Sequence, residues 1–192
     1  MTSGDSGPDS SLRSLRDRPF ELLKELEKRT RNMAIGTAPE AAAGREWVGV
    51  AFRMGGETFL VAREETREVL GYPAAVTRVP GAKGWVKGLA NVRGQLLPMV
   101  DLRQFLGSGV TAGGRNARVI VVNHRDVPAG LVVDEVLGFR RFAEREFHVE
   151  PPPTVIRCDS YLAGAFRRGG EVWPVLSLKS LVESPSFMQA AS

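Results

Sequence analysis

Four charged residues stand among apolar, strand-like stretches of this chain: Glu68, Arg93, Asp101 and Asp134. Arg93 lies in the turn-like segment VRG. There its planar guanidinium could hold a carboxylate through two parallel hydrogen bonds while its stem covers apolar surface. The residue type and its place in a turn therefore predict carboxylate binding at a surface. A plainer interpretation stays open, in which each of the four is a solvated strand end or a local cap.

Residues with catalytic or metal-binding chemistry are sparse. His124 and His148 each stand alone, without a partner at a spacing typical of metal ligands. Cys158 has no neighbouring arrangement of basic residues specific enough to indicate a nucleophile, and no serine lies in a GxSxG elbow. A glycine-rich phosphate loop ending in GKS or GKT is also missing. We therefore expect no metal site, no cofactor and no enzyme activity.

The overall charge gives weak support to nucleic-acid binding. The formal net charge is +4, with 26 basic residues mixed among 22 acidic ones. Small barrels that bind single strands need aromatic side chains along one open face. The three tryptophans, Trp47, Trp85 and Trp173, are spread over different expected strands, which is more typical of core. A nucleic-acid-binding module is therefore the weaker alternative, and a small enzyme lacks a catalytic set.

The single cysteine and the first residues indicate the compartment. Cys158 excludes an internal disulfide and fits a reducing environment. The start MTSGDSGPDS has neither the basic nor the apolar segment of a signal peptide, and no run of about 18 apolar residues could span a bilayer. We expect a cytoplasmic protein that reaches membranes only through its partners, without direct insertion.

The body of the chain is a duplication. Residues 88–107 (GLANVRGQLLPMVDLRQFLG) return as 164–182 (GAFRRGGEVWPVLSLKSLV) at a constant offset of 76. A second, shorter repeat precedes this one in the chain: REVLGY at 67–72 is similar to DEVLGF at 134–139. Two related subdomains are expected, approximately 45–112 and 113–183, with strand exchange between them.

The elements expected in this body are short strands. Alternation around Gly55 and Gly56 predicts a hairpin from Trp47 to Ala62. Pro98 and Pro174 lie inside strand-like runs, so both are expected at sheet edges or bulges. The remaining strands are expected at 76–79, 85–92, 96–101, 118–123, 129–133, 162–167 and 171–176. Short helical turns are expected at 64–70, 101–106 and 177–182.

The ends of the chain differ from this body. Residues 1–17 are predicted to be a disordered tail because they begin with small polar residues. Residues 18–44 are predicted to form an amphipathic helix with Pro19 in its first turn, followed by a Gly/Ala linker. A flexible tail is expected at 184–192.

The motifs of the duplicated body resemble a known family. The segment GLANVRGQLLPMVDLR, preceded by REVLGY and followed by ARVIVVNHRDVPAGLVVDEVLG, closely resembles the CheW family of chemotaxis coupling proteins. The resemblance covers about 45–183. It implies an all-β, CheW-like fold of two five-stranded SH3-like β-barrels with pseudo-two-fold symmetry, to which the N-terminal helix and short helical turns are added.

The resemblance also implies a function. It implies a non-catalytic chemosensory adaptor that couples the cytoplasmic tip of methyl-accepting chemoreceptors to the regulatory domain of a CheA-type histidine kinase. The family's receptor-binding groove is expected to take a receptor helix, with apolar anchors and a charged rim. The residues that match its receptor-binding positions are Glu68, Val69, Gly88, Asn91, Arg93, Gly130, Val132, Asp134 and Val136. Glu68 and Arg93 match the positions understood to pair beside that groove, whereas the kinase-binding residues stay unknown.

The segment RPFELLKELEKRTR departs from typical members, which begin close to the first barrel strand. It is similar to the PilI-type adaptors of type IV pilus (twitching motility) chemosensory systems. A type IV pilus pathway is therefore expected, and a flagellar chemotaxis adaptor is the alternative.

Overall fold

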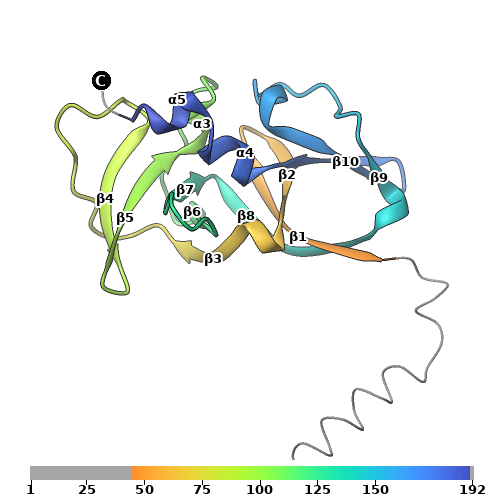
Figure 1. Cartoon of the computed structure of the whole chain (residues 1–192), viewed down its shortest axis with the longest axis horizontal. Helices are drawn as coiled ribbons and strands as arrows, with labels where there is room; N and C mark the ends of the chain where they lie inside the picture. The colour runs from red at the N-terminus through yellow and green to blue at the C-terminus, as the bar shows by residue number, and fades with distance from the viewer. Residues whose placement is uncertain (1–44, 191–192) are drawn as a thin grey trace, which may run out of the picture. The chain divides into compact units, whose positions relative to one another are not determined.

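The computed structural model describes residues 45–190, and in this part of the chain two β-sheets are joined by short helices (Figure 1). The expected N-terminal tail and helix lie outside the described residues. The six-stranded sheet has the order β8-β1-β2-β11-β10-β9, and the five-stranded sheet has the order β3-β6-β7-β5-β4. We call the five-stranded sheet the first barrel and the six-stranded sheet the second barrel.

The strands of the first barrel form one continuous stretch of chain. They are β3 (Thr66–Gly71), β4 (Val86–Val92), β5 (Gln95–Asp101), β6 (Arg118–Val122) and β7 (Gly130–Val133). The second barrel instead takes β1 (Glu46–Met54) and β2 (Glu57–Ala62) from the start of the described chain and adds β8 (Glu135–Ala143), β9 (Phe147–His148), β10 (Leu162–Arg168) and β11 (Glu171–Leu176).

The two sequence repeats exchange their leading hairpins. The first repeat contributes β1 and β2 to the second barrel, and the second repeat contributes β6 and β7 to the first barrel. Equivalent strands then occupy equivalent places, since β8-β1-β2-β11-β10 matches β3-β6-β7-β5-β4. Strands of each repeat therefore lie in the sheet of the other repeat. The boundary at 112/113 divides the repeats, but it does not divide the barrels.

The leading hairpin forms as its sequence predicts. Its alternating residues pair in register from Gly49 with Ala62 to Met54 with Glu57, and Gly55 and Gly56 make the turn with positive φ angles of 60° and 91°. The inward-facing Phe52 and Phe59 rings stack at 5.8 Å.

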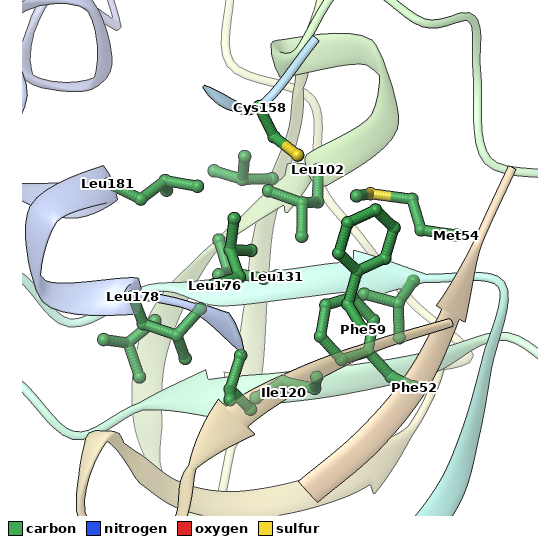
Figure 2. Close-up of a cluster of buried hydrophobic side chains, with 14 of the residues drawn as sticks. Phe52, Met54, Phe59, Leu102, Ile120, Leu131, Cys158, Leu176, Leu178 and Leu181 are labelled. Atoms are coloured by element: carbon green, nitrogen blue, oxygen red, sulfur yellow. The ribbon is translucent and has the colours of Figure 1, made fainter. Parts of the chain in front are cut away.

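One core joins the two barrels. Fully buried side chains of the leading hairpin meet residues of the first barrel and of the short helices α3 (Leu102–Phe105) and α4 (Leu178–Val182). Figure 2 shows Phe52 and Phe59 beside Leu102, with Leu131 and Leu176 nearby. Because the apolar residues of each repeat are buried against the other repeat, neither repeat has a complete core alone.

The chain end corrects one prediction. Residues 184–192 were expected to be a flexible tail, but Pro185–Met188 form helix α5, which Ser184 caps by accepting a hydrogen bond from the Phe187 amide. Phe187 is buried and stacks on Trp85 with ring centroids 5.7 Å apart. An aromatic side chain that fills the space beside a core tryptophan orders the segment that carries it.

Several element predictions were incomplete. The expected turn at 64–70 is a short 3-10 helix, Arg63–Glu65, followed by β3, and the strand expected at 76–79 is a single bridge between Thr77 and Leu89. Strand β8 was not predicted. Strands β3 and β8 lack a clean alternation of buried and exposed positions because each pairs with its neighbour through an irregular register.

The two strand prolines are not at edges or bulges, contrary to expectation. Pro98 pairs with Leu89 and Pro174 pairs with Ala165, inside strands with neighbours on both sides. Parallel pairing to the next strand begins at the following residue in both repeats, at Met99 and Val175. Each proline therefore sits at the margin of its parallel ladder, where a missing N–H donor is tolerated.

Candidate functional site

Glu68 and Arg93 form an ion pair across the seam of the first barrel. Glu68 lies on β3 and Arg93 in the turn between β4 and β5, and β3 and β4 are the two opposite edges of the sheet. The Arg93 Nη2 atom lies 3.0 Å from Glu68 Oε2. The Glu68 side chain is 21% exposed and the Arg93 side chain 77% exposed. Most of the guanidinium thus remains open to a partner.

The turn that presents Arg93 is strained. Val92 pairs with Gln95, so Arg93 and Gly94 are the two turn residues, with φ angles of 50° and 83°. Two successive left-handed residues are typical of a type I′ hairpin turn, a conformation that costs a non-glycine residue about 1–2 kcal/mol. The Asn91 carboxamide oxygen accepts a hydrogen bond from the Gly94 amide at 2.8 Å and supports the turn. Arg93 is the only non-glycine residue with positive φ in the described part of the chain.

Two adjoining hollows flank Glu68. One, of about 270 Å³, lies within the first barrel between Arg67, Arg93 and Val121. The other, of about 500 Å³, lies where the two barrels meet, because its lining includes Val69 of β3 and Phe139 of β8. Arg67 and Glu68 line both hollows. We call the two hollows together the seam groove.

Phe139 is a member of this groove that sequence reasoning missed. Its side chain is 60% exposed, an unusual state for a phenylalanine on a strand that pairs over most of its length. A signal was present in the repeat, since DEVLGF aligns Phe139 with Tyr72 of REVLGY, and Tyr72 is also exposed. An exposed aromatic residue beside a charged pair is typical of a protein-binding surface.

Two other predicted site residues, Val69 and Gly88, differ in their surroundings. Val69 lines the groove and also packs on the core. Gly88 is buried, with φ at 138°, and a Cβ atom there would lie 2.2 Å from the Thr77 carbonyl oxygen. Gly88 is therefore required by the close approach of the Thr77 backbone.

Three of the residues that match the family's receptor-binding positions do not line the seam groove. Gly130 is buried, where a Cβ atom would lie 2.8 Å from Met99 Sδ, and Val132 is 2% exposed inside the first barrel. Val136 packs against the joint core. None of the three lines the seam groove, because β7 is a central strand of its sheet and Val136 packs against the core, so their contact with a receptor stays a prediction.

Asp134 belongs to a different hollow. Its Oδ2 accepts a hydrogen bond from the Gly55 amide at 2.7 Å, which ties the leading hairpin to the link between β7 and β8. That hollow, also lined by Gly56, Arg103 and Arg115, shares no lining residue with the seam groove. Asp101 likewise has a structural role, since it is fully buried, caps α3 through the Gln104 amide and pairs with Lys87 at 3.3 Å.

The described residues hold no cluster that could bind a metal ion. Burial raises the pKa of the Cys158 thiol, so the thiol stays protonated and unreactive at neutral pH. Within residues 45–190 no group of three or more potential ligands could hold a metal ion. His124 lies 3.1 Å from Glu183, and its Nδ1 atom accepts the Val127 amide. In the same range, no helix has the length and apolar character needed to cross a membrane.

Comparison with known proteins identifies the family to which this chain belongs. Residues 48–186 match the CheW-like domain. The chain belongs to the CheW-like family. Protein PilI of Pseudomonas aeruginosa is 41% identical over 173 residues, which cover 90% of this chain and 96% of PilI. Chemotaxis protein CheW of Klebsiella aerogenes is 29% identical over 78% of this chain and 91% of that protein.

A solved CheW structure confirms the fold. The crystal structure of the scaffolding protein TtCheW from Thermoanaerobacter tengcongensis superposes with a TM-score of 0.66, covering 77% of this chain and all of that one, at 23% identity. The predicted all-β fold of two SH3-like barrels is therefore confirmed. With the PilI similarity, the family membership supports a chemosensory coupling adaptor of the type IV pilus pathway.

Proposed function

We propose that this CheW-like protein couples the cytoplasmic tip of a methyl-accepting chemoreceptor to the regulatory domain of a CheA-type histidine kinase, without catalysing a reaction itself. The setting is a type IV pilus (twitching motility) system, inside the cytoplasm at receptor arrays. The similarity to PilI supports the pathway, and the general association of the family with receptors and kinases supports the partner classes.

The receptor docks in the seam groove. The observation that carries this proposal is the Glu68–Arg93 pair, whose guanidinium is held out to solvent by a strained turn. The groove beside it offers the exposed Phe139 ring and the Val69 side chain to apolar residues of a helix. An amphipathic receptor helix can bury apolar anchors there while its polar side chains meet the charges at the rim.

A double-mutant cycle tests this site. Binding of a receptor tip fragment is measured with Glu68→Ala, Arg93→Ala and the double variant. Once a helix covers the pair, removing one partner leaves the other unpaired, and each single change is expected to cost about 2–5 kcal/mol of binding. A coupling energy above about 0.5 kcal/mol indicates that the two residues act as one unit.

The matched control is Arg141→Ala, which breaks the exposed Arg141–Glu46 pair at 2.9 Å, neither of whose residues lines the groove. It is expected to leave receptor binding unchanged, since exposed pairs contribute only about 0–1 kcal/mol. Phe139→Ala extends the test to the apolar side. If Glu68→Ala, Arg93→Ala and Phe139→Ala all remain folded and bind normally, the receptor binds elsewhere.

A further inference from the structure

The two barrels differ sharply in charge. From Thr66 to Val133, the range of the first barrel's strands, the chain has nine Lys and Arg residues and three acidic residues, Glu68, Asp101 and Asp126. Asp101 is fully buried and paired with Lys87, so it does not offset the positive surface. The strands of the second barrel and their connections, 46–62 and 135–188, carry eight basic and nine acidic residues. The duplication therefore pairs one basic barrel with one of balanced charge.

The basic barrel has a hollow of about 420 Å³ between the loop after β3 and the start of β4. Figure 1 shows this loop at the end of the molecule away from β9 and β10. Tyr72 and Val79, which are 41% and 40% exposed, line the hollow together with Arg78 and Lys83. We call it the basic pocket. It shares no lining residue with the seam groove.

The cations of the basic pocket are available to a partner. Among residues 45–190, neither Arg78 nor Lys83 forms an ion pair with a carboxylate. Lys87, which also lines the pocket, is by contrast paired with the buried Asp101. Two free cations beside exposed apolar side chains are suited to a carboxylate that is adjacent to an apolar residue.

The walls of the pocket are fixed. Thr77 and Leu89 exchange two backbone hydrogen bonds of 2.8 Å, and the Lys83 amide donates to the Ala190 carbonyl at 2.9 Å. The Val86 amide donates to the Lys83 carbonyl at 2.8 Å. Since the backbone is already ordered, a ligand has to order only the Arg78 and Lys83 side chains on binding.

We propose that the basic pocket is a second docking surface, which binds an acidic segment of a partner protein through carboxylates flanking an aliphatic or aromatic residue. A protein segment fits better than nucleic acid because Tyr72 is the only aromatic residue in the lining, so successive bases would have no stacking platform. A hollow lined by both basic and apolar side chains also fits a protruding side chain better than a flat anionic membrane. The surface is independent of the receptor site, so both can be occupied together.

The test titrates the full chain, labelled with ¹⁵N, with a peptide of alternating Glu and Leu residues. Amide signals of residues 72–87 are expected to shift. The affinity is expected to fall roughly tenfold or more in the double variant Arg78→Glu/Lys83→Glu, because each reversal turns an attraction into a repulsion. The matched control is Arg157→Glu/Arg167→Glu, which reverses two exposed, unpaired cations of the second barrel and should change affinity less than about twofold.

Three further ligands test whether another class of molecule binds in the basic pocket. A Lys–Leu peptide should not bind, and a single-stranded oligonucleotide and phosphatidylglycerol vesicles should bind more weakly than the Glu–Leu peptide, without selective shifts at 72–87. The proposal is overturned if the two double variants lose the Glu–Leu peptide equally, if the shifts fall elsewhere, or if the oligonucleotide or vesicles bind this pocket more tightly. Receptor-fragment binding, measured on the same variants, should stay unchanged, so failure here is distinct from failure at the seam groove.

Discussion

The two repeats place an arginine–glutamate pair beside equivalent hairpins, yet the pairs are built differently. In the second repeat, Arg168 precedes the turn, donates from Nε to Glu146 at 2.8 Å and covers the Phe142 ring at 4.5 Å. Glu146 is also held by the Ala143 amide. In the first repeat, Arg93 occupies the turn itself and reaches Glu68 through a single contact.

The turns differ in the same way. Gly169 and Gly170 adopt φ angles of 58° and 84°, nearly the values at Arg93 and Gly94, with glycine at both positions. The second repeat thus has an unstrained glycine where the first has Arg93, and its ion pair is held by several contacts. This arrangement stabilises the fold. The first repeat accepts strain and exposes its arginine. Within one duplicated unit, this difference separates the hairpin that stabilises the fold from the hairpin that is suited to binding.

The largest effect is expected from separating the repeats. Fragments 45–112 and 113–190 should each lack a cooperative thermal transition because each contains the hairpin that completes the other's barrel. Circular dichroism and NMR dispersion measure this. Mixing or co-expressing the fragments should restore folding, and a well-dispersed spectrum from either fragment alone would contradict the shared core.

The second-largest effect is expected at Gly88 and Gly164, the glycines at the β-bulges of β4 and β10. Gly88→Ala and Gly164→Ala place a Cβ atom 2.2 Å and 2.4 Å from a backbone carbonyl oxygen, at positive φ. Both should lower the free energy of unfolding by about 2–5 kcal/mol, measured by chemical denaturation. Gly71→Ala is the control, since a Cβ atom there meets nothing within 4 Å. Similar losses at both bulges would show that the repeats still share this feature, while a small loss at Gly88 alone would argue against its structural role.

Exchanging the turn residues tests the comparison directly. Arg93→Gly should raise the free energy of unfolding by about 1 kcal/mol, because the relief of left-handed strain exceeds the loss of an exposed ion pair. Gly169→Arg should lower it by about the same amount. The stabilised Arg93→Gly variant should nevertheless bind the receptor fragment more weakly. Destabilisation by Arg93→Gly would show that the ion pair, rather than the strain, dominates this turn.

The smallest effect concerns pH. The hydrogen bonds from Arg168 and from the Ala143 amide lower the pKa of Glu146 to about 2 from 4.5. Because the pKa is depressed in the folded state, Glu146 stabilises the fold above about pH 4.5, and this contribution is lost as the pH falls toward 2. Melting temperatures of wild type and Glu146→Gln should therefore differ at pH 6 and converge near pH 2. Glu171→Gln, at an exposed carboxylate without an ion pair, controls for the general loss of one charge.

The sequence by itself determined the features that depend on neighbouring residues. Gly55 and Gly56 located the leading hairpin, the 76-residue offset showed the duplication, and the VRG motif placed Arg93 in a turn. Each of these rests on turn chemistry or on period-two alternation, which are local. Helix α5 escaped prediction because four residues carry little periodicity, and its order comes from Phe187 packing on Trp85.

Only the tertiary structure decided which hairpin pairs with which barrel. Both repeats carry the same pattern, so the sequence could not distinguish a hairpin that stays with its own repeat from one that crosses. That choice buries Gly130 and Val132, exposes Phe139 and brings Glu68 to Arg93 across the seam. The reason is physical: burial and charge pairing depend on contacts between residues far apart in the chain, whereas turns and strands are set by residues a few positions apart.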